Sequence, residues 1–149
     1  MLAEGLSLGL FAWILSASGL LFGAALGVLG LLDPRWAQRL VRLKPDDQGG
    51  GFAEFRATYG GVFFGLHAVT LLLAVKWLAN GGEVVGVAAT GAVAAVAAGW
   101  AGAAGGRLLS MLRDEGCATP FNRLSVGIET ALACAIGAPW ALWMLGVTG

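Results

Sequence analysis

The chain has 149 residues and no net charge, with 58% hydrophobic and only 12% charged residues. A soluble globular domain has about 25% charged residues, so this composition excludes a soluble domain with an ordinary water-facing surface. The balanced charge excludes the basic surface that nucleic acid requires, and two cysteines, Cys117 and Cys134, are too few for a disulfide framework. The composition instead indicates a membrane protein, in which the 25 glycines are also expected.

Four stretches are long and apolar enough to cross a bilayer, since a spanning helix needs about 20 mostly apolar residues. We expect spans at about residues 6–32, 55–78, 84–109 and 124–147. The first has Glu4 where a secretory signal would be basic, and its apolar run is too long for a signal, so we interpret it as a retained span. The predicted fold class is an all-α integral membrane protein, a four-transmembrane-helix bundle that forms one domain over residues 1–149.

The loop after the first span contains a predicted short amphipathic helix at about residues 34–43. Asp33 can cap this helix and Pro34 suits its first turn. Apolar residues fall on one face and arginines on the other, which is typical of a helix that lies in the membrane interface. The residues Asp46-Asp47-Gln48 and Gly49-Gly50-Gly51 are expected to form a flexible hinge into the second span.

The basic residues predict the orientation, because cytoplasmic loops carry an excess of lysine and arginine. The first and third loops hold most of them: Arg35, Arg39, Arg42 and Lys44, with Arg56 just beyond, and then Arg107, Arg113 and Arg123. The opposite side has only Lys76. We therefore expect these loops in the cytoplasm and both termini outside. Aromatic anchors fit this arrangement, with Trp36 near the inner interface and Trp77, Trp140 and Trp143 near the outer one.

Small residues repeat at intervals of four along three spans, as in helices that approach one another closely within lipid. The repeats are Gly19, Gly23 and Gly27 in the first span, Gly61 and Gly65 in the second, and Gly102 and Gly106 in the third. The third span is almost wholly Ala, Gly and Val, so we expect it to be the most enclosed helix. The same repeats could also mark a contact between copies of the chain.

Polar residues within the spans are the best functional pointers, because ionisable groups in hydrocarbon cost several kcal/mol unless paired or facing a cavity. Helical spacing places them on stripes that converge near the cytoplasmic ends of spans two, three and four. We expect Glu129 to pair with Arg56, Arg107 or both, while Tyr59 and Ser110 satisfy its remaining lone pairs. The candidate binding residues are Arg56, Tyr59, His67, Arg107, Ser110, Asp114 and Glu129.

Two residue strings carry a resemblance to a known family. One is Arg56-Ala-Thr-Tyr59-Gly60-Gly61, and the other is Arg107-x-x-Ser110-x-x-x-Asp114 followed by a single glutamate in the last span. Together they resemble a family of small four-span bacterial membrane proteins whose domain has no assigned function, over about residues 4–145. Glu115 stands between the acidic residue and Gly116, a departure from that family's loop. The resemblance implies a bacterial inner-membrane protein with this fold and supplies no activity.

Three functions remain open at this point. The first is a non-enzymatic module whose cytoplasm-facing polar cluster binds a membrane lipid or similar amphiphile, or docks on a larger membrane complex. The second is a small membrane enzyme of the lipid or isoprenoid isomerase type, with Glu129 as acid/base and Tyr59 or Arg56 as the electrophilic partner. The third is a transporter or channel subunit, which would need a homo-oligomer because no inverted repeat is visible. His67 has no second histidine to complete a haem site, so we expect no cofactor and no metal.

Overall fold

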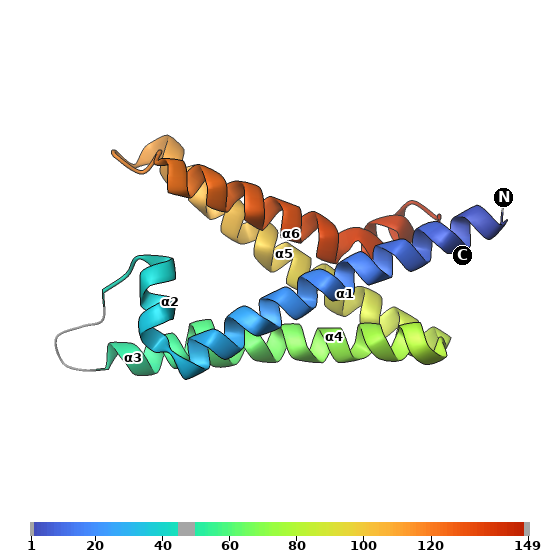
Figure 1. Ribbon diagram of the computed structural model, residues 1–149. Coiled ribbons are helices and arrows are strands. Elements are labelled where there is room, and N and C mark those ends of the chain that lie inside the picture. The colour runs from blue at the N-terminus through green and yellow to red at the C-terminus, as the bar shows by residue number, and fades with distance from the viewer. Residues whose placement is uncertain (1, 45–49, 148–149) are drawn as a thin grey trace. The chain divides into compact units, whose positions relative to one another are not determined.

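The computed structural model describes the backbone of residues 2–44 and 50–147, and the side chains of residues 8–44 and 50–147. Within these ranges most of the chain is helical and no strand is present (Figure 1). In chain order the elements are α1 (Leu2–Leu32), α2 (Pro34–Val41), α3 (Gly51–Glu54), the π-helix η1 (Phe55–Val62), α4 (Phe63–Asn80), α5 (Glu83–Arg113) and α6 (Pro120–Met144). Of the expected hinge at residues 46–51, residues 46–49 lie outside the described residues, while Gly50 precedes α3 and Gly51 is its first residue.

Four helical stretches are long and apolar enough to cross a membrane, which confirms the predicted all-α, four-span fold class. They cover 8–32, 51–80, 83–113 and 120–144. The second span starts earlier than expected because α3, η1 and α4 form one continuous helix. The fourth also starts earlier, at Pro120, where the Thr119 hydroxyl caps the helix by accepting a hydrogen bond from the Asn122 N–H at 3.2 Å.

The chain divides into two compact units. The larger unit contains residues 1–19 and 73–149, and the smaller unit contains residues 20–72. Helices α1 and α4 each contribute to both units, since each passes from one to the other along its length. The prediction of a single domain over the whole chain stays a prediction.

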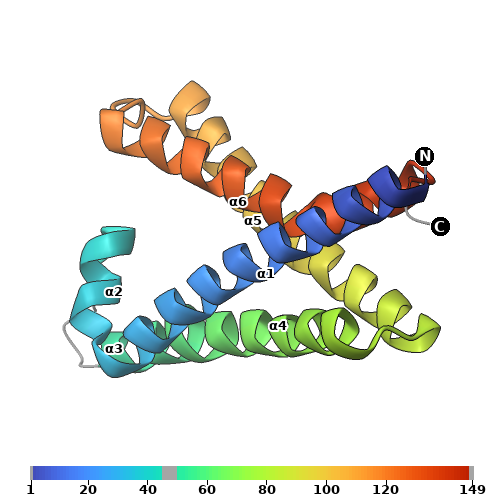
Figure 2. The same ribbon diagram turned by 45° about the vertical axis from the view of Figure 1, so that its right-hand side comes forward.

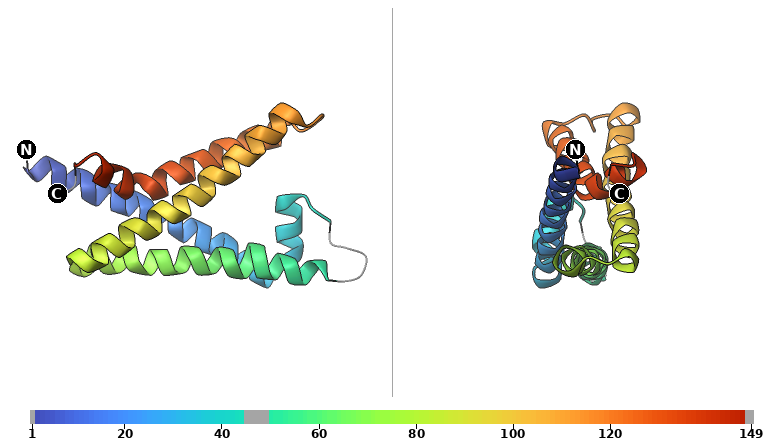
Figure 3. Two further views of the ribbon diagram at one scale, coloured as in Figure 1. Left: turned by 180° about the vertical axis from the view of Figure 1, so that it is seen from behind. Right: turned by 90° about the vertical axis from the view of Figure 1, so that its right-hand side faces the viewer.

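In the larger unit α5 and α6 run antiparallel and side by side (Figures 1 and 2). The first part of α1 packs on α6, where the fully buried Ser16 hydroxyl donates a hydrogen bond to the Ile136 carbonyl at 2.8 Å. This bond lies three residues before Pro139, which has no N–H to donate to the neighbouring Ala135 carbonyl, so Ser16 joins α1 to α6 within the turn that the proline weakens. The start of α1 and the end of α6 lie at the same end of this unit (Figure 3).

In the smaller unit the last part of α1 packs directly on η1 and the start of α4. A Cβ added at Gly27 would lie 2.5 Å from the Phe64 backbone nitrogen, and one added at Gly30 would lie 2.5 Å from the Tyr59 carbonyl oxygen. A Cβ at Gly60 would lie 2.7 Å from the Leu31 nitrogen. Because backbone faces backbone at these positions, only glycine permits the observed approach.

The short helix α2 confirms the helix expected after Asp33. The Asp33 carboxylate accepts hydrogen bonds from the N–H groups of Arg35 and Trp36 at 3.0 and 3.1 Å. The helix turns away from the line of α1 (Figure 2) and contacts η1, with Pro34 and Ala37 buried.

One expectation about packing is wrong. The third span is not the most enclosed, since 17% of the most apolar part of α5 is buried against 39% for α1. Gly65, Gly102 and Gly106 would each have open space around an added Cβ, so these glycines do not mark a contact within the chain, and a contact between copies of the chain stays a prediction. The glycine spacing identified helices that can pack closely, but it could not tell which face of each helix meets a neighbour.

Candidate functional site

The polar cluster of the larger unit centres on an ion pair between Arg107, near the end of α5, and Glu129, in the first half of α6. The Arg107 Nε donates to both carboxylate oxygens at 3.2 Å, and Nη2 donates to Oε1 at 2.8 Å. The Glu129 side chain is 10% exposed and that of Arg107 is 34% exposed. The expectation that Glu129 pairs with at least one of two arginines is confirmed for Arg107.

Asn122 extends this pair into a network. Its Oδ1 accepts a hydrogen bond from the Arg107 Nη1 at 3.3 Å, and its Nδ2 donates to the Cys117 carbonyl at 2.7 Å. The Asn122 backbone N–H is held by the Thr119 cap. The network therefore ties the guanidinium to the loop between α5 and α6. Asn122 was not among the candidate binding residues predicted from the sequence.

Two other candidate residues lie at the end of α5. The exposed Asp114 follows the last residue of the helix, and its N–H donates to the Ser110 carbonyl at 2.8 Å. The Ser110 side chain is half-buried. Both residues thus lie at the same end of α5 as the ion pair.

The candidates Arg56 and Tyr59 belong to the smaller unit, where both lie on the π-helix η1. The Arg56 Nε donates to the Leu31 carbonyl at 3.2 Å, in the last turn of α1. Carbonyls in the last turn of a helix lack intrahelical partners, so Arg56 caps α1. Tyr59 is half-exposed and its ring lies 5.7 Å from that of Phe55. A π-helix is rare and often marks a functional site, and this one contains the string Arg56–Gly61.

His67 is buried on α4 in the smaller unit. Its Nδ1 lies 2.7 Å from the Phe63 carbonyl oxygen, which accepts the hydrogen bond, and its ring stacks on Phe63 with centroids 4.4 Å apart. The ring also fills the space above Gly23, where an added Cβ would collide with it. His67 therefore has a packing role at the contact between α1 and α4.

The structure thus brings Arg107 and Glu129 together and joins Asn122 to them, with Ser110 and Asp114 nearby on α5. Arg56, Tyr59 and His67 are described within the smaller unit, so the convergence of all three stripes stays a prediction. Among the described residues, no group of three or more His, Cys, Asp and Glu side chains could hold a metal ion.

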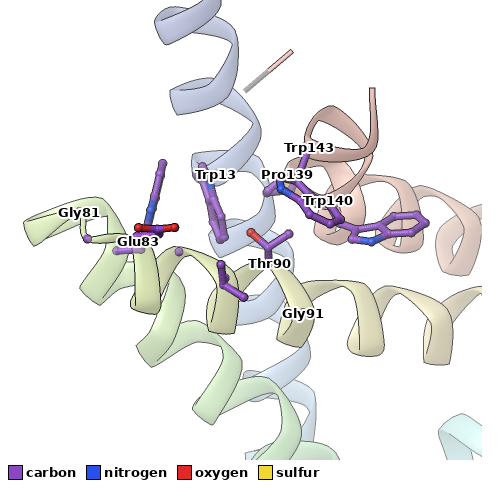
Figure 4. A pocket seen from close by; sticks show the side chains of 12 residues that line it. Trp13, Gly81, Glu83, Thr90, Gly91, Pro139, Trp140 and Trp143 are labelled. Carbon is purple, nitrogen blue, oxygen red and sulfur yellow. The ribbon is translucent and has the colours of Figure 1, made fainter. Parts of the chain in front are cut away.

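The larger unit also has a pocket at the end opposite the Arg107–Glu129 pair, and the sequence did not predict it. It has a volume of about 570 Å³. Its lining comes from α1, the end of α4, the following turn, α5 and α6: Trp13, Trp77, Gly81, Gly82, Glu83, Gly86, Val87, Thr90, Gly91, Pro139, Trp140 and Trp143 (Figure 4). Three of its tryptophans were interpreted as interface anchors. The signal that could have found it is the presence of tryptophans at the same end of three spans, beside a carboxylate.

No protein-family model, curated protein or solved structure matches the chain.

Proposed function

We propose that the protein is a non-enzymatic membrane module whose polar cluster binds the anionic head group of a lipid-like amphiphile. The observation that carries this proposal is the fixed, partly exposed guanidinium of Arg107. A guanidinium has five N–H groups, and the bonds to Glu129 and Asn122 engage one each on Nε, Nη1 and Nη2. Nη1 and Nη2 each carry a second N–H group, and two such donors on one guanidinium can bind a phosphate or carboxylate as a fork.

The surroundings of this guanidinium also suit an amphiphile. Arg113 and Arg123 are exposed at the same end of α5 and α6 and add positive charge. A groove of about 310 Å³ lies at the same level of the two helices, and its lining is almost wholly apolar: Ala101, Ala104, Gly105, Leu108, Val126, Thr130, Ala133 and Cys134. Such a groove can hold part of an acyl chain while the arginines hold the head group.

The geometry favours binding over acid–base catalysis. A general acid or base needs an oxygen within hydrogen-bond reach of the substrate, whereas both oxygens of Glu129 accept bonds from Arg107. The carboxylate is better placed to orient the guanidinium than to exchange protons.

The proposed location is a bacterial inner membrane, with the cluster facing the cytoplasm. Two arguments support it. The basic residues concentrate in the first and third loops. The Arg56–Gly61 and Arg107–Asp114 strings resemble a family of bacterial inner-membrane proteins. Both termini would then lie outside the cytoplasm.

Native mass spectrometry of the protein purified in a non-ionic detergent tests the proposal. We expect an anionic lipid to remain bound to the unmodified protein, and Arg107→Gln to reduce its occupancy at least about fivefold, since a charge-assisted fork is removed. Arg107→Lys should also bind less well, because an ammonium keeps the charge but loses the fork.

Arg113→Gln is the matched control, because it removes the same charge from an exposed arginine outside the network. Equal losses in Arg113→Gln and Arg107→Gln would show non-specific attraction and contradict the site. Recovery of the unmodified protein with a partner protein and no lipid would favour docking on a larger complex instead.

A further inference from the structure

The tryptophan pocket combines buried and exposed indole rings. Trp13 is 4% exposed and its ring lies 4.6 Å from that of Trp77 at an interplanar angle of 30°. Gly86 allows this arrangement, because a Cβ there would lie 2.8 Å from the Trp77 Nε1. Trp140 and Trp143 complete the lining from α6 and are exposed. A membrane anchor needs a ring at the interface, but it does not need a buried ring on the wall of a cavity.

The charge of the lining favours a cation. Glu83 is the only ionisable residue among the twelve that form the pocket, and Thr90 supplies the only hydroxyl. Figure 4 shows the Glu83 carboxylate and the Thr90 hydroxyl on either side of Trp13. The lining also contains four indole rings, and tryptophan is the side chain that attracts cations most strongly through its ring.

The start of α5 opposes this attraction only in part. Glu83 is the first residue of α5, where the helix dipole places roughly half a positive charge. The full negative charge of the carboxylate exceeds that partial charge. The pocket therefore keeps a net attraction for positive charge.

We propose that this pocket is a second binding site, which takes the quaternary ammonium group of a small amphiphile or of a lipid head group. Aromatic side chains that line a pocket recognise such cations elsewhere in proteins, and Figure 4 shows the Glu83 carboxylate beside Trp13. The volume of about 570 Å³ lies within the roughly 300–1,000 Å³ of ordinary ligand pockets. The apolar remainder of the lining suits the carbon chain attached to the ammonium. This site is distinct from the Arg107–Glu129 pair and does not depend on the function proposed for it.

Titration of the purified full chain in a non-ionic maltoside detergent tests the inference, with tryptophan fluorescence as the readout. Benzyltrimethylammonium is the probe, and neopentylbenzene, in which carbon replaces the charged nitrogen, is the neutral comparison. We expect saturable quenching by the cation and binding at least about fivefold weaker for the neutral compound, since only the cation gains the ring and carboxylate attraction.

The variants separate the pocket from general charge. Glu83→Gln and Trp140→Leu, which change exposed residues, should each weaken binding of the cation about fivefold, while Glu83→Gln leaves the neutral compound unaffected. Glu115→Gln, an exposed carboxylate beyond the other end of α5, and Trp36→Leu on α2 are the matched controls and should bind as the unmodified protein does. Circular dichroism verifies that every variant is folded.

The source of the ammonium is decided by competition. If added phosphatidylcholine displaces the probe, the ammonium group belongs to a lipid head group, and if it does not, the ammonium group belongs to a small amphiphile. Equal affinity for the charged and neutral compounds, quenching that does not saturate, or equal losses in Glu83→Gln and Glu115→Gln would each overturn the proposal.

Discussion

Arg107 and Glu129 join α5 to α6 through three hydrogen bonds, of which the Nη2–Oε1 bond is the shortest at 2.8 Å. Both residues lie within helices that are apolar enough to cross a membrane. Hydrocarbon penalises either charge alone, so the pair fixes which faces of the two helices meet. The same pair orients the guanidinium that we propose as the head-group site.

The first prediction concerns the energy of this pair. Removal of one partner leaves the other charge in an apolar setting, so Arg107→Met and Glu129→Leu should each destabilise the protein by about 1–3 kcal/mol. The lower part of this range is expected because Arg107 is 34% exposed and water screens its charge. The double variant should be less destabilised than the sum of the two, since it leaves no unpaired charge. Unfolding in mixed micelles with increasing dodecyl sulfate measures each step, and strict additivity would show that the two side chains are not coupled.

Hydrophobic length and the cost of charge in lipid made the larger features of this chain predictable. Hydrophobic length is a local property of the sequence, so the four spans followed directly from it. The cap at Asp33 followed from another local signal, an aspartate directly before a proline. The pairing of Glu129 with Arg107 followed as well, because an isolated carboxylate within a span requires a partner.

Helix rotation and backbone geometry were not predictable in the same way. The sequence identified Gly61 and Gly65 as the packed pair, whereas η1 turns Gly60 toward α1 and leaves Gly65 in open space. A π-helix changes the angle between successive side chains, so a stripe drawn with α-helical spacing drifts off its face. The tryptophan pocket was missed because each tryptophan, taken singly, has an adequate explanation as an interface anchor.

The second prediction uses two glycines on the second span. Gly60→Ala should destabilise the protein by about 1–3 kcal/mol, because its Cβ would lie 2.7 Å from the Leu31 backbone nitrogen and the helices would have to separate. Gly65→Ala is the matched control and should leave stability unchanged or raise it by up to about 1 kcal/mol, since alanine is the better helix former and no atom lies within 4 Å. Thermal denaturation in detergent compares them, and equal effects would show that the approach of α1 to η1 does not stabilise the fold.

The third prediction tests whether His67 has a packing role against Gly23. The added methyl of Gly23→Ala would collide with the His67 ring, which its bond to the Phe63 carbonyl holds in place. We expect Gly23→Ala to cost about 1–3 kcal/mol of stability, and most of that cost to disappear in a His67→Ala background, where the ring is gone. The same denaturation assay gives the coupling. An undiminished cost in that background would mean that Gly23 matters for a contact other than His67.

The fourth prediction concerns orientation, for which the two cysteines provide a probe. Cys117 is half-buried in the loop between α5 and α6, while Cys134 is exposed in the middle of α6, where lipid would cover it. A thiol reacts as its thiolate, which needs water. In a Cys134→Ser variant expressed in a bacterial host, a membrane-impermeant maleimide should therefore label Cys117 only after the cells are permeabilised. A cysteine placed at the exposed Asn80, in a background without the native cysteines, should be labelled on intact cells. The reverse pattern would place the Arg107–Glu129 pair on the outer side, and the anionic head group would then have to come from the outer leaflet.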